Sequence, residues 1–340
     1  MADFKAAIIG CGGRASYHAE AYLKNEDIEL VAVADMDTKR ADSFGENFGG
    51  KVYHDAEKML DEAKPDIVSV ATREHPRSML TTMCAESGVK GIIAEKPMSR
   101  TLNQAYEMVE VCEANDCVLT VCMQMRFCPV FIRAREVIKN GEIGRPYFLR
   151  ACSYGALMEQ GPHIIDTILF VIGDRKVVSV MAQVDEIEKS NDMVHPCPVF
   201  TVGYLKLEDD TRVVIESGRT FAGVPELGGT WLQKRVEILG TEGMCDAVVS
   251  HYCKVLRSDT PGWQVTKSSN KDWDAATPLF IEQLVDVIRN GGEHINNGRE
   301  SLRGFEIIQA MYQSVLTKSA VELPMDRNLT PLEEIMTAGE

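Results

Sequence analysis

Residues 4–15 read FKAAIIGCGGRA, and this stretch decides the fold. An apolar run typical of a buried strand leads directly into the pattern G-x-G-x-x-A, whose fixed positions are Gly10, Gly12 and Ala15. The first glycine permits a tight turn, the second lets a diphosphate approach the backbone, and the small third residue lets the following helix pack on the strand. The start of that helix offers N–H groups and a positive dipole end to the diphosphate. The stretch therefore predicts a dinucleotide-binding turn, to which Gly13 and Arg14 are also assigned.

The next predicted strand, residues 29–35, ends in Asp35. A carboxylate at this place can accept hydrogen bonds from both ribose hydroxyls of an adenosine, and it repels a 2′-phosphate. The predicted cofactor is therefore NAD. Lys39 and Arg40 follow closely enough to keep NADP as a less favoured alternative.

Strand-like apolar runs alternate with helical patterns up to residue 125. Near-continuous apolar runs are typical of parallel strands that are covered on both faces, and the alternation implies right-handed crossovers. Thr101 and Gln104 are spaced as a capping pair for one of the helices. We predict an α/β fold class in which residues 1–125 form an N-terminal Rossmann domain with a doubly wound parallel sheet. The expected strands are 4–10, 29–35, 66–72, 91–96 and 118–125, and the expected helices are 16–24, 38–47, 76–87 and 101–115.

From about residue 147 onwards, apolar and polar residues alternate within the strand-like runs. This pattern is typical of antiparallel strands with one covered face. Helical patterns at 161–173, 278–290 and 299–318 can supply the cover. We predict a C-terminal α+β domain over 126–325 with an open, mainly antiparallel sheet, followed by a C-terminal tail at 326–340. The stretch 223–231, which contains Trp231, is expected to form a lid, an arm or a long hairpin.

The charge balance excludes several classes of partner. The 340 residues include 36 Lys and Arg against 51 Asp and Glu, a net charge of −15, without the clustered cations that bind phosphate backbones. No apolar stretch approaches the roughly 18 residues of a membrane span. The ten cysteines contain no CxxC pair, so we expect reduced, buried thiols and no metal site. These features predict a cytoplasmic protein that binds neither nucleic acid nor membrane.

Several further motifs carry a resemblance to a known family. The specific ones are Glu95-Lys96-Pro97 at the end of a predicted strand and His163 within GPHIID. Together with the glycine-rich turn, they resemble the glucose–fructose oxidoreductase / inositol dehydrogenase / MocA family. Supporting segments are ATREH (71–75), QMRFCP (124–129), GEIGRP (141–146), LGTEG (239–243) and AMYQSVLTKSAVELP (310–324). The sequence departs from the family pattern at Arg73, where a Pro is usual, and at Glu159, where the family has Asp.

The resemblance implies where the active site lies. Lys96 and His163 would flank a substrate hydroxyl beside the nicotinamide, with Glu159 or Asp166 setting the tautomer of the histidine. Asp166 stands three residues after His163 and could instead pair with a neighbouring helix or loop. The same resemblance assigns further residues to the cofactor: Thr72, His75, Glu95, Lys96 and Gln124. Arg126 is expected to be structural or to support the site.

These assignments predict an NAD-dependent oxidoreductase that takes a hydride from a secondary hydroxyl of a sugar, glycoside or cyclitol. One alternative is an enzyme that keeps NAD bound and uses transient oxidation at sugar C3 to drive elimination of a glycosidic substituent. The other is an NAD-binding sensor that lacks catalysis. The family comparison also implies a homodimer or homotetramer formed through the C-terminal sheet.

The remaining histidines and arginines have weaker signals. His195 is expected in a loop, and the two alternatives for it are a place in the lining of the substrate cleft and a position away from the site. Surface positions are expected for His18, His54, His251 and His294, and surface or salt-bridge positions for Arg73, Arg77, Arg150 and Arg219.

Overall fold

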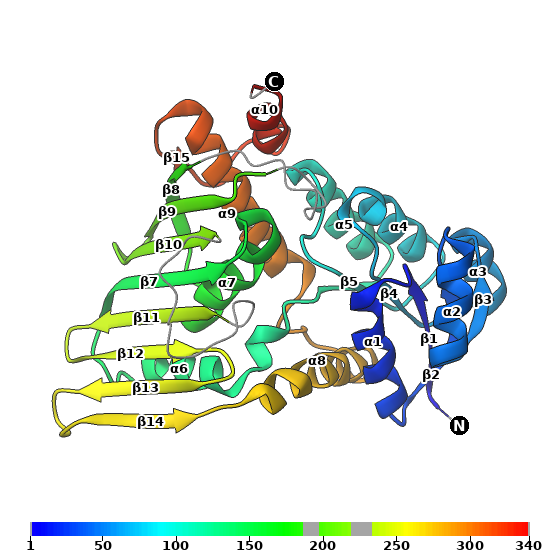
Figure 1. The fold of residues 1–340 in the computed structure, drawn as a ribbon, viewed down its shortest axis with the longest axis horizontal. Helices are drawn as coiled ribbons and strands as arrows, with labels where there is room; N and C mark the ends of the chain where they lie inside the picture. The colour runs from blue at the N-terminus through cyan, green and yellow to red at the C-terminus, as the bar shows by residue number, and fades with distance from the viewer. Residues whose placement is uncertain (1, 186–196, 219–232, 339–340) are drawn as a thin grey trace. The chain divides into compact units, whose positions relative to one another are not determined.

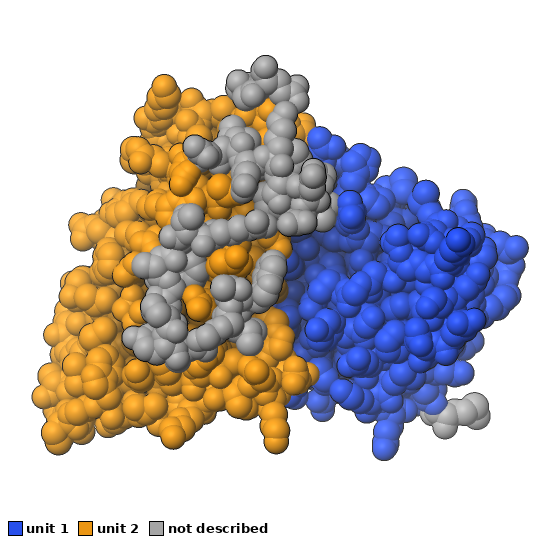
Figure 2. Space-filling view, viewed as in Figure 1, with its two compact units in different colours: residues 1–124, 275–302 blue, residues 125–274, 303–340 orange. Residues whose placement is uncertain are grey.

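The computed structural model describes residues 2–185, 197–218 and 233–338. The chain forms two compact units, shown in Figures 1 and 2: Met1–Gln124 with Ala275–Leu302, and Met125–Asp274 with Arg303–Glu340. The sequence analysis placed 275–302 in the second domain, whereas the structure packs this segment with the first. His195, Arg219 and the stretch 223–231 lie outside the described residues.

The first unit contains a six-stranded parallel sheet in the order β3-β2-β1-β4-β5-β6. This confirms the predicted parallel sheet, of which the sequence analysis named five strands. Its strands are β1 (Phe4–Ile9), β2 (Ile28–Ala34), β3 (Lys51–Tyr53), β4 (Ile67–Val70), β5 (Gly91–Ala94) and β6 (Val118–Val121). Its crossover helices are α1 (Gly13–Lys24), α2 (Thr38–Phe48), α3 (Ala56–Ala63), α4 (Glu74–Glu86) and α5 (Leu102–Ala114). Strand order reverses between β1 and β4, and ligands of such sheets bind outside the carboxyl ends of the strands at that reversal.

Residues 275–302 join the first unit because they cover its sheet. A Cβ added at Gly91 on β5 would lie 2.6 Å from Ile288 Cδ1, so the helix α8 (Asn270–Asn290) packs directly against that strand. The residue Thr120 on β6 also forms an antiparallel bridge with Asn297. Apolar periodicity predicted the helix at 278–290, but periodicity alone does not say which sheet a helix covers.

The second unit contains a nine-stranded sheet, which confirms the open, mainly antiparallel sheet that the sequence predicts. Its order is β14-β13-β12-β11-β7-β10-β9-β8-β15, and among the described strands only β7 and β10 pair in parallel. The strands are β7 (Pro146–Tyr154), β8 (Val177–Val184), β9 (Phe200–Leu207), β10 (Arg212–Gly218), β11 (Lys234–Gly240), β12 (Gly243–Val248), β13 (Tyr252–Arg257), β14 (Trp263–Lys267) and β15 (Val321–Glu322).

Helices cover one face of this sheet. The helix α6 (Pro129–Lys139) packs on β12 and β13, and α7 (Leu157–Val171) packs on β7, β10 and β11. The helix α9 (Gly298–Thr317) reaches β8, where Ser314 Oγ accepts a hydrogen bond from Ala182 N at 3.0 Å. On the opposite face, the paired residues Met181 and Tyr204 remain 45 % and 39 % exposed. The chain ends with α10 (Pro331–Ala338), and no helix in the described ranges combines the length and apolarity needed to cross a membrane.

The capping pair predicted for α5 is present, and it supports a stability prediction. Thr101 Oγ1 accepts from Gln104 N, and Gln104 Oε1 accepts from Thr101 N. Thr101→Ala removes one half of this capping box and is expected to lower the free energy of unfolding by about 1 kcal/mol. Urea denaturation measures the change. As a control, Thr317→Ala removes an exposed hydroxyl that donates to the Gln313 carbonyl and accepts from Ser319 Oγ, and because water can replace both bonds it should change stability by much less. An equal loss in both variants would contradict the capping role.

Candidate active site

The glycine-rich turn has the geometry that its sequence predicts. Gly10 has φ = +91°, and a Cβ there would lie 2.8 Å from Thr72 N, so a side chain is excluded by both conformation and space. Cβ positions at Gly12 and Gly13 meet nothing within 4 Å, which leaves their backbone accessible. Gly12 is the N-cap of α1, and no side chain caps this end. A bare helix amino terminus behind an accessible backbone fits the diphosphate of a dinucleotide.

Asp35 follows β2 directly and is held beside this turn. Its Oδ2 accepts from Cys11 N at 2.8 Å, and its Oδ1 accepts from Asp37 N at 2.9 Å. Arg40 Nη1 lies 3.6 Å from Oδ2. The carboxylate is thus oriented by two backbone N–H groups, with a cation from α2 nearby. Burial and the Asp35 charge together raise the pKa of the Cys11 thiol to about 12, so this thiol stays protonated.

The loops after β4 and β5 carry Thr72 and Lys96, and a buried arginine joins them. The guanidinium of Arg77, on α4, donates to the carbonyl oxygens of Thr72 and Pro97. Arg77 is 2 % exposed, and burial lowers its pKa to about 10. The expectation of a surface or salt-bridge role for Arg77 is therefore wrong, since it bonds two backbone carbonyls in the interior. Lys96 itself is half-buried.

Glu95 is buried at the end of β5 and connects to α1. Its Oε1 lies 3.0 Å from Arg14 Nε and 3.1 Å from His18 Nε2. His18 is 0 % exposed, and the surface position expected for it is wrong. The surface position expected for His294 is wrong too, because Phe280 O and Asn296 N hold its buried ring. Amphipathic periodicity shows which face of a helix is apolar, but it does not reveal that a buried histidine has polar partners.

The other predicted cofactor residues of the first unit differ in exposure. Gln124 is 1 % exposed, and its Oε1 lies 3.8 Å from Cys122 Sγ. Thr72 is half-buried beside Gly10, whereas His75 and Arg73 are exposed near the start of α4. All ten cysteines are buried, and none forms a disulfide in the described structure.

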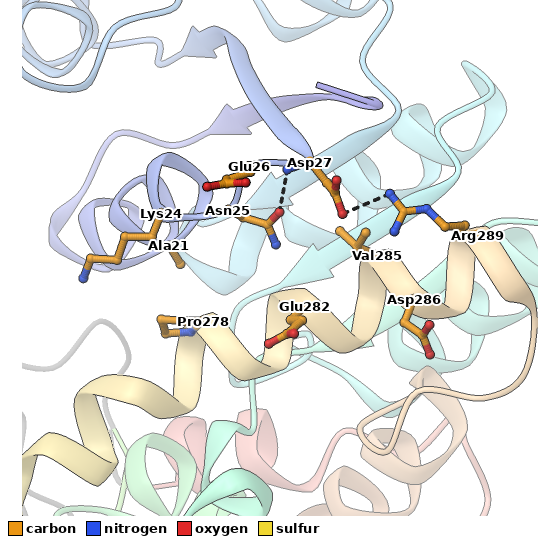
Figure 3. A pocket seen from close by; sticks show the side chains of 10 residues that line it. All are labelled: Ala21, Lys24, Asn25, Glu26, Asp27, Pro278, Glu282, Val285, Asp286 and Arg289. Atoms are coloured by element: carbon orange, nitrogen blue, oxygen red, sulfur yellow. Dashed lines mark hydrogen bonds and ion pairs between the residues drawn. The ribbon is translucent and has the colours of Figure 1, made fainter. Parts of the chain in front are cut away.

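A surface cavity of about 460 Å³ in the first unit contains none of these residues (Figure 3). It is lined by the carboxyl-terminal end of α1, the turn that follows, and α8. Arg289 at its edge lies 3.0 Å from Asp27 and 2.8 Å from Asp3. We assign the candidate cofactor site to the glycine-rich turn and not to this cavity.

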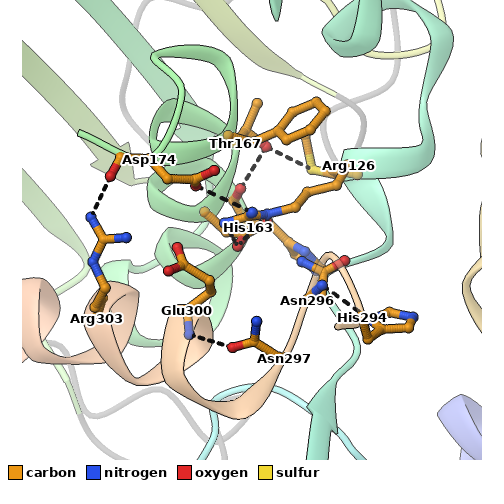
Figure 4. Close-up of polar contacts among 12 residues, drawn as sticks. Arg126, His163, Thr167, Asp174, His294, Asn296, Asn297, Glu300 and Arg303 are labelled. Atoms are coloured by element: carbon orange, nitrogen blue, oxygen red, sulfur yellow. Dashed lines mark hydrogen bonds and ion pairs between the residues drawn. The ribbon is translucent and has the colours of Figure 1, made fainter. Parts of the chain in front are cut away.

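In the second unit, His163 lies on α7, which begins four residues before the predicted start (Figure 4). His163 is 4 % exposed, and its ring meets Trp273 edge-on with centroids 6.4 Å apart. Its carbonyl accepts from Thr167 Oγ1 at 2.7 Å. The half-buried Glu159 precedes His163 by one turn of the same helix, so both side chains share a face.

Asp166 is bound by Arg126, the pairing that the sequence analysis left open. Arg126 Nε lies 2.9 and 3.0 Å from the two carboxylate oxygens of Asp166, and Nη2 lies 2.8 Å from Oδ1. Both side chains are almost fully buried. Arg126 also reaches Asp174 at 3.3 Å (Figure 4). This geometry gives Asp166 a structural partner and agrees with the structural role expected for Arg126.

Comparison with known families identifies the chain. Residues 4–123 match an oxidoreductase family with an NAD-binding Rossmann fold, and residues 135–323 match the C-terminal alpha/beta domain of the same family. The chain belongs to this Gfo/Idh/MocA family of oxidoreductases. The protein is thus an oxidoreductase whose first unit binds NAD, as the sequence analysis predicts.

Individual relatives of this oxidoreductase include several sugar dehydrogenases. It is 27 % identical to a D-apiose dehydrogenase of Paraburkholderia graminis, over 94 % of this chain and 90 % of the relative. It is 33 % identical to the D-glucoside 3-dehydrogenase of Escherichia coli, over 52 % of this chain and 56 % of the relative. The structure of levoglucosan dehydrogenase with NADH and levoglucosan has a TM-score of 0.84 at 18 % identity, covering 94 % of this chain and 99 % of that one. This last similarity demonstrates the shared fold.

The Arg126–Asp166 pair leads to a prediction that separates a structural role from a catalytic one. Asp166→Asn leaves the Arg126 charge buried without its full counter-charge, and it is expected to reduce the free energy of unfolding by about 3 kcal/mol. Asp174→Asn is the matched control, because the Asp174 side chain is 27 % exposed and Arg126 keeps its closer partner Asp166. We expect that variant to lose less than about 1 kcal/mol. Urea denaturation followed by circular dichroism makes the comparison, and equal stabilities for the two variants would refute the structural role.

Proposed function

We propose that this oxidoreductase oxidises a secondary hydroxyl of a sugar, glycoside or cyclitol by hydride transfer to NAD. The observation that carries the proposal is the placement of Lys96 directly after Glu95 at the carboxyl end of β5, with Arg77 joining its loop to Thr72 beside the glycine-rich turn. Ligands of a doubly wound sheet bind at this edge. A half-buried lysine there can meet the reacting part of a substrate.

Each proposed catalytic residue has a distinct task. Lys96 hydrogen-bonds the substrate oxygen and stabilises the developing alkoxide charge. His163 accepts the hydroxyl proton as general base, and Glu159, one turn earlier on α7, orients its ring. NAD, when bound, supplies the acceptor for the hydride. We place Asp166 outside this chemistry, in the ion pair that fixes α7 to Arg126.

The cofactor assignment follows the same residues. With NAD bound, backbone N–H groups of Gly12, Gly13 and Arg14 would hold the diphosphate, and the Asp35 carboxylate would accept from the adenosine ribose. Thr72, His75, Lys96 and Gln124 are proposed to line the nicotinamide end. Arg40 lies close to Asp35 and is the cation that the 2′-phosphate of NADP would meet. The Asp35 carboxylate would repel that phosphate, so NAD is favoured over NADP.

Two relatives guide the choice of substrate class. The D-apiose and D-glucoside dehydrogenases are named for substrates that are polyhydroxylated rings or their derivatives. The name of the second also specifies oxidation at position 3, which supports a test of glycosides beside free sugars. We further propose a cytoplasmic homo-oligomer formed through the open face of the nine-stranded sheet, where Met181 and Tyr204 are exposed.

The proposal predicts a specific pattern of lost activity. Purified protein is incubated with NAD and a panel of cyclitols, free sugars, uronates and aryl glycosides, and reduced nicotinamide is followed by absorbance. Lys96→Ala and His163→Ala are each expected to lower kcat by about 100-fold or more with any substrate that the panel identifies. Lys96→Ala removes the group that stabilises the substrate oxygen, and His163→Ala removes the base that accepts its proton. NAD affinity, measured by calorimetry, should change much less than kcat.

Matched surface variants control this experiment. Lys90→Ala and His54→Ala remove a lysine and a histidine whose side chains are 58 % and 48 % exposed, and both should retain the parent kcat. Near-parent turnover in the Lys96 and His163 variants would refute the assignment. The ratio of NADH formed to product formed tests the net reaction: a ratio of one supports oxidation, and an eliminated aglycone without NADH supports the redox-neutral alternative.

A further inference from the structure

The carboxylate of Glu95 lies at the centre of a buried polar cluster in the first unit. Glu95 is 3 % exposed. Its Oε1 accepts a hydrogen bond from Arg14 Nε at 3.0 Å and lies 3.1 Å from His18 Nε2, so two side chains of α1 hold this oxygen. Its Oε2 accepts from the Lys96 backbone N–H at 3.1 Å, so the other oxygen holds the residue proposed to act on substrate. One side chain thus connects the helix of the glycine-rich turn to Lys96.

The cluster extends away from Lys96 through hydroxyl groups. His18 Nδ1 lies 2.9 Å from Ser69 Oγ on β4, and Ser69 Oγ lies 2.6 Å from Tyr22 OH. These bonds fix the ring of His18, so that its Nε2 faces Glu95. Because the His18 ring, these two hydroxyl groups and the Glu95 carboxylate are buried, losing one would leave a polar group without its partner, and the arrangement resists rotation of the Glu95 side chain.

The same cluster contains a geometric candidate for a metal site, which we reject. Ligand atoms of His18, Glu95 and Cys122 lie within 4.8 Å of one another. However, the Arg14 guanidinium lies 3.0 Å from the Glu95 carboxylate and 3.9 Å from Cys122 Sγ. Burial raises the pKa of the Cys122 thiol to about 12, which keeps it protonated. The Arg14 guanidinium already supplies the positive charge beside this carboxylate, and the protonated thiol is no ligand for a metal ion.

The charge of Glu95 is maintained despite its burial. Burial by itself would raise the pKa of Glu95, but Arg14, His18 and Lys96 together hold that pKa well below its usual range. The carboxylate is therefore ionised at neutral pH. A fixed anion beside Lys96 favours the protonated form of the lysine, in which it can donate to a substrate oxygen.

We propose that Glu95 is a positioning residue, whose carboxylate orients Lys96 and keeps it protonated while Arg14 and His18 fix the carboxylate from α1. Only the consequence for catalysis rests on the proposed function. Titratable and charged groups facing the cluster are Arg14, His18 and Tyr22 from α1, Glu74 and Arg77 from α4, and Cys122 after β6.

The decisive test measures the titration of Lys96 without any substrate. Lysines of the full-length protein are reductively methylated with ¹³C-formaldehyde and titrated by NMR, and Lys96→Arg assigns the Lys96 signal. Glu95→Gln preserves shape but removes the anion, so it should lower the Lys96 midpoint by about one pH unit or more. Arg14→Met removes a neighbouring cation and should raise the midpoint. The Arg14 side chain is 35 % exposed, so this variant is expected to fold even if Glu95→Gln does not.

Two further variants serve as controls. Glu95→Asp retains the anion and should restore most of the parent midpoint. Tyr22→Phe removes the hydroxyl at the far end of the cluster, leaves the charge of Glu95 unchanged, and should leave the midpoint unchanged. Folding of every variant is checked by circular dichroism. A Lys96 midpoint that is the same in the parent, the folded Glu95→Gln variant and Arg14→Met would overturn the proposal.

Activity provides the second measurement once a substrate is known. In Glu95→Gln, kcat is expected to fall about 10-fold or more, and its decline at alkaline pH should begin at a lower pH, because the lysine loses its proton earlier. A lower kcat with an unshifted pH profile would show that Glu95 is merely structural. If no compound of the panel is oxidised, the proposed function fails, while the NMR titration still decides the role of Glu95.

Discussion

Gly10 imposes the constraint on which the first unit depends. Its φ of +91° and its contact with the Thr72 backbone let the chain turn sharply off β1 and enter α1 within three residues. Because the turn is this tight, the start of α1 lies at the carboxyl edge of the sheet, where β4 and β5 also end. The same placement brings Arg14, at the start of α1, to the Glu95 carboxylate that follows β5.

The buried charges of the two units follow the same physical rule. A guanidinium in the interior needs a counter-charge or several carbonyls to replace its hydration. Arg126 meets this need with Asp166 and Asp174, whereas Arg77 meets it with the carbonyls of Thr72 and Pro97. Arg77 thereby fixes two loops that have no helix or strand hydrogen bonds of their own, and Arg126 holds the helix α7. These segments border the residues proposed to bind cofactor or substrate.

Sequence patterns predicted elements well where the pattern is local. The glycine-rich turn, the parallel strands and the Thr101 capping box depend on neighbours within a few residues, and the structure confirms them. The three-residue strand β3 was missed, because so short a strand has almost no periodicity to detect. The helix α3, eight residues long, was missed as well. The segment 275–302 was assigned to the wrong unit, since an apolar helix face is equally suited to either sheet. His18 was expected at the surface because its partners Ser69 and Glu95 are distant in sequence.

The sequence by itself determined the fold class, the cofactor and the family, because glycines, strand periodicity and a terminal carboxylate are read within short segments. Only the tertiary structure decided the partners of the buried polar groups. Asp166 meets Arg126, His18 meets Glu95, and Arg77 meets two carbonyls through packing between elements that are far apart in the chain. Burial brings together side chains from distant segments, and each buried polar group then needs a hydrogen-bond or charge partner among them. No local sequence pattern contains that information.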